Sequence, residues 1–213
     1  MKTKIPKIIH QLWVGDKPIP EQIKGFTDKM PEINQGYECK LWGNEVFDRY
    51  KDDPFLTNYL KEPDLYRWAF ICDRIRCLLL KDIGGIYVDA DALPIQSFDL
   101  CMNKLSENIT FFTGMKPTQQ NNTLFDCAVY ASTPNSRMIN NLIDTYDDIN
   151  WANGCKIFSD RIIKDMDSDV ACFGYEYFYD DKETEKTIVL HDTEETRLFS
   201  WVWDDEQKRR ENW

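Results

Sequence analysis

Residues 73–91, DRIRCLLLKDIGGIYVDAD, contain the pattern that decides the fold. Apolar residues within and before this stretch recur at helical spacing, which predicts a helix over residues 63–83. Two glycines follow and end the helix. A short apolar strand, residues 86–88, then leads directly into Asp89-Ala-Asp91. The sequence therefore predicts two carboxylates at the carboxyl end of a buried strand.

Strands and helices alternate along the rest of the chain. Runs of β-branched and aromatic residues predict strands, whereas apolar residues spaced by three and four predict helices. The expected strands span residues 5–13, 37–42, 86–88, 109–113, 124–131, 171–175 and 187–191, and the expected helices span residues 21–30, 44–50, 53–60, 63–83, 136–149 and 156–166. This alternation predicts an α/β layered domain, which binds its ligand at the carboxyl ends of strands.

The bulk composition is that of one globular domain. The chain has 213 residues, of which 42% are apolar, and this length suits a single domain with a proper core. No run of about 18 apolar residues occurs, so no transmembrane segment is predicted, and the polar N-terminus predicts no signal peptide. A net charge of −11 disfavours nucleic-acid binding, which needs a basic surface. We therefore expect a cytoplasmic protein of bacterial or viral origin.

The cysteines predict neither a zinc site nor disulfides. There are seven of them, and no two have Cys-x-x-Cys spacing. The odd number and the positions within apolar runs predict reduced, buried thiols. Two Asn-x-Thr sequons begin at Asn108 and Asn121, and we interpret them as coincidental because no secretion signal precedes them.

The Asp-x-Asp motif is a candidate metal site. Alternate residues of an extended segment face the same side, so Asp89 and Asp91 are expected to reach one ion. Mg²⁺ and Mn²⁺ prefer carboxylate and phosphate oxygens. An ion held here would bridge the diphosphate of a nucleotide sugar and act as a Lewis acid on the leaving group. Surface acidic pairs such as Asp167-x-Asp169 share the pattern, so the interpretation depends on the strand and the double glycine before Asp89.

Asp73 and Arg76 lie three residues apart on the helix before the motif and therefore share a face. A surface ion pair would contribute little to stability. The surrounding segment is strongly apolar, however, so we expect a partly buried pair that holds sugar hydroxyls and orients the donor. Arg74 is expected to point elsewhere on the helix.

Histidines are scarce in this chain, which has two of them. His10 lies within the first expected strand, where a buried histidine with satisfied hydrogen bonds is the default interpretation. His191 ends the last expected strand beside an acidic residue, and it is a candidate ligand for a metal or a phosphate.

Two aromatic positions are candidate ligand contacts. Trp13 follows the first strand and is either a nucleobase-stacking residue or a core residue. Near the C-terminus, the hydroxyl of Ser200 and the indole N–H of Trp201 are two donors suited to a leaving diphosphate. Packing of this aromatic segment against the core is the alternative.

Three segments, taken in order, resemble the sugar transferases with a DXD-containing sugar-binding region, that is, glycosyltransferase family 32 and the related capsular polysaccharide synthesis proteins. Residues 5–15 are similar to the opening strand and loop of that family, residues 36–42 to its second strand, and residues 73–91 to its core motif. The core motif has an Asp, an Arg three residues later, a Gly-Gly-hydrophobic-Tyr stretch and then Asp-x-Asp. The resemblance covers roughly the first half of the chain.

This resemblance implies a GT-A fold: α/β, one nucleotide-sugar-binding domain with a mixed central β-sheet flanked by helices. In a single domain over residues 1–213, residues 1–91 would bind the nucleotide sugar, and residues 92–213 would supply the acceptor side and a C-terminal diphosphate flap. It also implies a metal-dependent hexosyltransferase of polysaccharide biosynthesis that uses Mn²⁺ or Mg²⁺ and retains anomeric configuration. The donor would be a UDP-sugar, with a GDP-sugar as the alternative, and the acceptor a glycan, glycolipid or glycoprotein.

The same resemblance assigns a role to each matching residue. Leu12 and Trp13 would contact the base, Asp73 and Arg76 the donor sugar, Asp89 the ribose, the sugar and the metal, Asp91 the metal, His191 the metal or the diphosphate, and Ser200 and Trp201 the diphosphate. One departure from the family concerns the link between His191 and Ser200, which is acidic and lacks the usual glycine.

Three alternatives remain open from the sequence. The chain could be a catalytically silent nucleotide-sugar-binding module, although the intact Asp-x-Asp, Asp73 and Arg76 favour an enzyme. A metal-dependent phosphohydrolase is a further alternative, but its usual ligand cluster is hard to assemble from two histidines. An inverting transferase would need a carboxylate base opposite the leaving group, for which Asp126 is a conceivable candidate.

Overall fold

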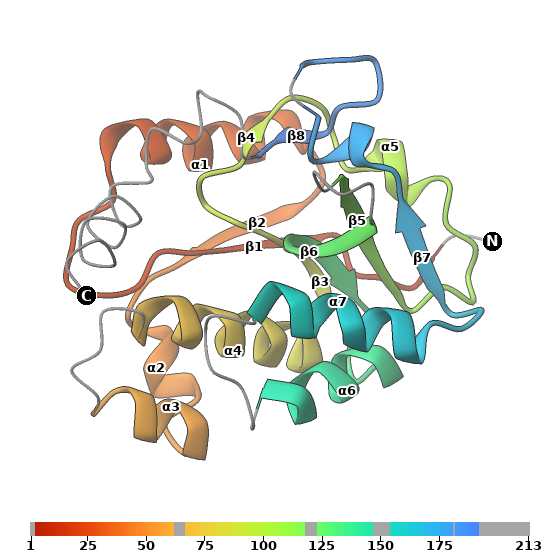
Figure 1. Cartoon of the computed structure of the whole chain (residues 1–213). Coiled ribbons are helices and arrows are strands. Elements are labelled where there is room, and N and C mark those ends of the chain that lie inside the picture. The colour runs from red at the N-terminus through yellow and green to blue at the C-terminus, as the bar shows by residue number, and fades with distance from the viewer. Residues whose placement is uncertain (1–2, 62–66, 118–122, 147–153, 181, 192–213) are drawn as a thin grey trace, which may run out of the picture.

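A six-stranded mixed β-sheet forms the centre of the molecule in the computed structural model, which describes residues 3–61, 67–117, 123–146, 154–180 and 182–191 (Figure 1). The strand order is β2-β1-β3-β6-β5-β7. The strands are β1 Ile8–Leu12, β2 Glu38–Trp42, β3 Gly85–Val88, β5 Phe111–Pro117, β6 Thr123–Ser132 and β7 Val170–Phe173. Within this sheet β6 runs antiparallel to both of its neighbours, whereas the other pairs are parallel.

Helices cover both faces of the sheet (Figure 1). One face carries α1 Glu21–Ile33 and the short α5 Asp99–Met102, and the other carries the layer of helices around α4 Arg67–Asp82. The remaining helices of that layer are α2 Val46–Arg49, α3 Pro54–Tyr59, α6 Arg137–Tyr146 and α7 Gly154–Asp165. None of the described helices is both long enough and apolar enough to cross a lipid bilayer.

The two faces of the sheet carry separate hydrophobic clusters. On β3, Tyr87 packs into the cluster on the α4 side, whereas Ile86 and Val88 pack into the cluster on the α1 side. This division follows from the alternation of side chains along a strand. Because all residues of β3 are buried, the strand has apolar side chains on both faces, as is typical of a central strand in an α/β sheet.

The double glycine before β3 has a specific steric role. Gly84 and Gly85 have φ values of 71° and 111°, a left-handed region that favours glycine. A Cβ on Gly85 would lie 2.5 Å from the backbone oxygen of Ile8. The pair therefore ends α4 and allows β3 to lie close against β1.

A second, two-stranded sheet pairs β4 Leu93–Pro94 with β8 Val189–Leu190. Leu93 lies opposite Leu190, and the side-chain amide of Gln96 donates to the carbonyls of Thr184, Glu185 and Thr187. This small sheet brings residues near position 190 beside the segment that follows Asp91.

The expected fold class is confirmed: a mixed central sheet is flanked by helices. The expected strands and helices recur with shifted ends, and the expected start of the 63–83 helix lies outside the described residues. The sequence did not predict β4, whose two residues are too few to show a periodicity, or the single-turn helix α5. The expected strand 187–191 is reduced to two residues.

Candidate active site

Asp89 and Asp91 lie directly after β3, at the edge of the sheet where β1, β2 and β5 also end. The backbone N–H of Asp89 donates to the Ala128 carbonyl (2.9 Å), which continues the β3–β6 ladder by one bond. A turn follows, in which the N–H of Ala92 donates to the Asp89 carbonyl (3.1 Å). The side chains of Asp89 and Asp91 are 29% and 40% exposed, so both can contact a ligand.

His191 joins the two aspartates through the small sheet. Its Nε2 atom lies 3.4 Å from Asp91 Oδ1 and 3.8 Å from Asp89 Oδ2. One ligand atom from each of the three residues fits within 4.8 Å of the others, which suits a shared ion. The Nδ1 atom of His191 is buried and has no hydrogen-bond partner among the described residues. An imidazole with two carboxylates fits Mn²⁺ better than Mg²⁺, because Mg²⁺ strongly prefers oxygen.

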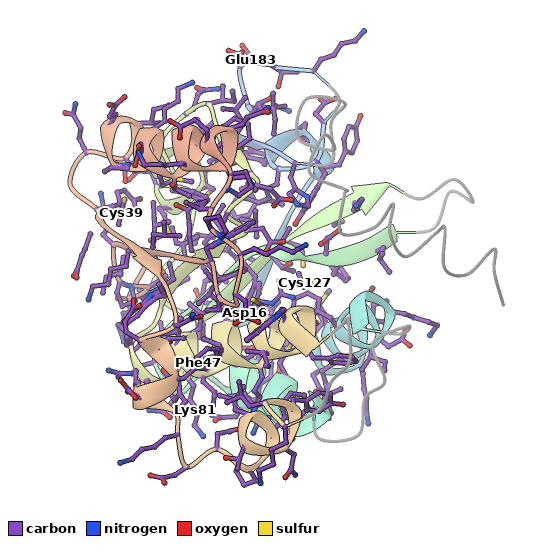
Figure 2. All side chains as sticks on the ribbon, turned by 90° about the vertical axis from the view of Figure 1, so that its left-hand side faces the viewer. Asp16, Cys39, Phe47, Lys81, Cys127 and Glu183 are labelled. Atoms are coloured by element: carbon purple, nitrogen blue, oxygen red, sulfur yellow. The ribbon has the colours of Figure 1, made fainter. Side chains whose placement is uncertain are left out.

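Arg76 connects α4 to the motif. Its guanidinium contacts the carboxylates of Asp73 and Asp89 and donates to the Cys127 carbonyl at 2.8 Å. The Arg76 side chain is almost fully buried, and its Nε atom has no partner within the described part of the chain. Cys127, labelled in Figure 2, belongs to β6 and packs into the hydrophobic cluster on the α4 side. The expected partly buried Asp73–Arg76 pair is thus present, and it touches the motif directly.

Tyr87 is a site residue that the sequence reading did not single out. Its hydroxyl donates to Asp89 Oδ1 (2.7 Å), and its ring lies 5.2 Å below the Arg76 guanidinium. The sequence could have indicated Tyr87, because residues 87 and 89 are two apart in an extended segment and therefore face the same side. With Oδ1 of Asp89 occupied by Tyr87 and Arg76, its Oδ2 is the oxygen that faces His191.

The electrostatics of the site follow from closely spaced charges of opposite sign. Burial and the neighbouring charge of Asp91 raise the pKa of Asp89, although Arg76, His191 and Tyr87 oppose this change. For His191, burial lowers the pKa, but the hydrogen bond and charge of Asp91 and the charge of Asp89 outweigh it and raise the pKa overall. Without a metal, the site therefore favours a proton on His191, which a cation would replace.

The expected base-binding loop lies at the end of β1. Leu12 is buried in the core, and the Trp13 indole N–H donates to the Lys17 carbonyl within its own loop (3.0 Å). Gly15 has φ 115°, and a Cβ on it would lie about 3.0 Å from the Trp68 indole. This loop is folded tightly against the start of α4.

Other expectations fall outside the site or outside the described residues. Ser200 and Trp201 lie beyond residue 191, outside the described residues. Arg74 points away from the motif, as expected, and pairs with Asp53 at 3.0 Å. His10 is a buried histidine with both ring nitrogens bonded, which confirms the default interpretation.

A comparison with protein families matches residues 20–112 to the glycosyltransferase sugar-binding region containing a DXD motif. The match includes α4, β3 and the Asp89-Ala-Asp91 motif. It thereby confirms the resemblance to DXD sugar transferases inferred from the sequence. The match ends before Asp126 and His191, so these two residues depend on the geometry alone.

Curated relatives support the same relationship over part of their length. A mannosyl phosphorylinositol ceramide synthase of Saccharomyces cerevisiae is 29% identical over 115 residues, which cover 54% of this chain and 28% of the relative. A protein named "Toxin" from Photorhabdus asymbiotica is 27% identical over 176 residues, covering 66% of this chain and 6% of the relative. The chain therefore spans less than a third of the length of these relatives.

Solved structures with the same fold include two glycosyltransferases. The PaToxG glycosyltransferase superposes with a TM-score of 0.55 at 18% identity, covering 78% of this chain and 70% of that one. A glycosyltransferase involved in the glycosylation of the major capsid of PBCV-1 gives a TM-score of 0.51 at 9% identity, covering 95% and 99% of the two chains. At these identities the similarity shows the fold, which is GT-A.

Proposed function

We propose, because residues 20–112 carry a DXD sugar-transferase region, that this chain is a metal-dependent glycosyltransferase. It moves a hexosyl group from a nucleotide-diphosphate sugar to a hydroxyl of a glycan, lipid or protein, with retention of configuration. The observation that carries the proposal is the convergence of Asp89, Asp91 and His191 at the carboxyl end of β3. A divalent cation bound there would neutralise the diphosphate as it leaves.

The residues around this site have complementary roles in the proposed reaction. The Asp73–Arg76 pair offers an acceptor and a donor to the hydroxyls of the donor sugar. Arg76 is kept in place by the Cys127 carbonyl and by Asp89, and Tyr87 orients Asp89 in turn. Residues that bond in this way to a ligand-binding side chain hold it in a productive geometry. Trp13 contacts the base at the end of β1.

Retention needs no side chain as a nucleophile in this scheme. The bond between the anomeric carbon and the diphosphate oxygen breaks, and the acceptor oxygen forms the new glycosidic bond on the same face. The acceptor proton passes to the departing diphosphate oxygen. The nearby carboxylates Asp73 and Asp89 are both paired with Arg76, an arrangement that favours binding roles for them over covalent attack.

A thermal-shift panel tests the proposal most directly. Each UDP- and GDP-sugar is added with and without Mn²⁺, because a ligand that binds only the native state raises its melting temperature. A metal-dependent shift with one nucleotide class supports the site and names the base, and release of nucleotide on turnover then separates an enzyme from a silent binding module. No shift with any sugar nucleotide in the presence of Mn²⁺ would refute the proposal.

A further inference from the structure

The backbone of β6 is irregular where it passes the site. Thr113 of β5 lies opposite Tyr130, but the next residue, Gly114, lies opposite Asp126. Residues 127–129 of β6 therefore have no counterpart on β5. Such a bulge turns a strand and re-aims a side chain, and bulges are over-represented beside active sites.

Polar backbone groups of this bulge bond to β3 and to side chains of Arg76, Asp126 and Tyr179. The bonds are Arg76 Nη1 to the Cys127 carbonyl (2.8 Å), Asp89 N–H to the Ala128 carbonyl (2.9 Å), Ala128 N–H to Asp126 Oδ1 (3.0 Å) and Val129 N–H to the Tyr179 hydroxyl (3.2 Å). Because β6 is antiparallel to its neighbours, its first residues lie at the edge where they end. The bulge thus fixes Asp126 at the same edge as the candidate metal site.

Asp126 is a buried carboxylate with two partners. Its side chain is 8% exposed. Its Oδ1 accepts a hydrogen bond from the Ala128 N–H, and its Oδ2 lies 3.2 Å from Lys116 Nζ. Burial alone would raise its pKa, but the charges of Lys116 and His191 and the N–H bond lower it overall. The carboxylate is therefore ionised at neutral pH and is a weak base.

Tyr179 links this pair to the candidate metal site. Lys116 Nζ lies 5.9 Å from the Tyr179 ring centroid, and the same ring meets the His191 ring edge-on at 6.1 Å. The Lys116 side chain is 28% exposed, so the outer side of the ion pair reaches solvent. A negatively charged acceptor and a positively charged donor thus lie 3.2 Å apart, and the Tyr179 ring stands between them and His191.

We propose that Asp126 and Lys116 form a carbohydrate subsite that binds two adjacent hydroxyls of a sugar ring. One hydroxyl donates to the Asp126 carboxylate, and its neighbour accepts from the Lys116 ammonium. Hydrogen bonds to charged groups are the stronger kind, and a buried site strengthens them further. Asp126 acts as a positioning residue in this role and takes no proton. The inference rests on the proposed function, and the diol belongs either to the donor sugar or to the acceptor.

Two substitutions separate this role from a structural one. Asp126→Asn keeps an oxygen for the Ala128 N–H but removes the charge, so it should fold like the wild type, whereas Asp126→Ala should melt lower. Lys116→Met removes the cationic donor. Asp169→Asn is a matched control, because Asp169 also pairs with a cation, Arg137 at 2.6 Å, and is held by Thr110 (2.9 Å) outside the site.

The kinetic experiment has a donor arm and an acceptor arm. The donor arm measures hydrolysis of the nucleotide sugar chosen by the thermal-shift panel, with water as acceptor. The acceptor arm measures transfer to a series of methyl glycosides. We expect D126N and K116M to raise KM for the sugar about ten- to one-hundredfold in one arm, with D169N unchanged. A raised donor KM assigns the diol to the donor, and a raised acceptor KM with normal hydrolysis assigns it to the acceptor.

Binding of the free nucleoside diphosphate with Mn²⁺ supplies the discriminating measurement, because that ligand lacks the sugar. The subsite predicts no change in this affinity in D126N. Wild-type KM in both arms, or an equal loss of free-nucleotide affinity, would overturn the subsite while leaving the proposed function intact. A wild-type protein that neither binds nor hydrolyses any nucleotide sugar would overturn the proposed function itself.

Discussion

The two ends of β3 each meet a histidine, and the two histidines differ in how many partners they have. At the amino end, His10 receives the Trp42 indole N–H on Nδ1 (3.1 Å) and donates from Nε2 to the Gly84 carbonyl (2.9 Å). At the carboxyl end, His191 shares Nε2 between Asp89 and Asp91, and its Nδ1 has no partner among the described residues.

This difference in hydrogen-bond partners indicates where a ligand is expected to bind. A buried polar group whose partners all come from its own chain stabilises the fold, whereas a buried group left without one carries a cost that a ligand can relieve. The two arginines of α4 repeat this contrast. Arg74 pairs with Asp53 and donates to the Ile143 carbonyl (2.9 Å), whereas Arg76 keeps an unpartnered Nε beside the motif.

The largest expected effect is at the carboxyl end. Asp91→Asn should lower metal-dependent turnover about a hundredfold or more, because a bound cation contributes several kcal/mol to the stabilisation of the leaving group. The unfolding free energy should change by less than about 1 kcal/mol, since the Asp91 side chain is 40% exposed. Steady-state kinetics and urea unfolding measure the two quantities. Turnover near that of the wild type would remove Asp91 from the site.

His191 should contribute mainly to metal affinity. His191→Ala is expected to weaken Mn²⁺ binding at least about tenfold, the loss typical when even an outer-shell partner of a metal is removed. Titration calorimetry with Mn²⁺ measures this effect, and His10→Ala is the matched control because His10 lies at the other end of β3. Equal Mn²⁺ affinity in the wild type and in H191A would show that His191 is not a metal ligand and does not differ from His10 in this respect.

At the amino end of β3, a substitution of His10 should lower stability and leave turnover nearly unchanged. His10→Ala leaves the Gly84 carbonyl and the Trp42 indole N–H buried without a partner, at a cost of about 2–4 kcal/mol in unfolding free energy. Turnover per folded molecule should change little, because the fold is weakened and the site is not. Chemical denaturation gives the first value and active-site titration the second. A kinetic defect larger than the stability defect would contradict a purely structural role.

The smallest effect is on pH dependence, and the two histidines should differ in sign. Burial lowers the pKa of His10 below its usual 6.5, so its stabilising contribution is present above that value and is lost as the pH falls below it. The pKa of His191 is raised, so without metal its contribution is present at lower pH and is lost as the pH rises through its folded pKa.

Proton NMR can resolve both titrations, because the chain has only two histidines. One imidazole signal should titrate below pH 6.5 and the other above it, and H10A identifies the first. Addition of Mg²⁺ should shift only the His191 signal. Titration of both signals at the same pH would show that their environments do not differ as the contacts indicate.

Much of the site was predictable because its central residues are local in sequence. The spacing of Asp73, Arg76, Asp89 and Asp91 follows from one helix, one double-glycine turn and one strand. Helical and extended periodicities fix which side chains share a face, so the carboxylate pair and the Asp73–Arg76 pair could be read directly. His10, by contrast, lies within one apolar run and His191 ends another. Periodicity gives no means of telling a histidine with satisfied hydrogen bonds from a ligand.

The sequence by itself determined the α/β class, the end of α4 at the double glycine, and the two aspartates after β3, because these features depend on contacts between near neighbours. Only the tertiary structure decided the rest. The pairing of β4 with β8 sets His191 against Asp91, and the reversed direction of β6 with its bulge brings Asp126 to the same edge. Strand order arises from packing between residues distant along the chain, and local periodicity does not encode it.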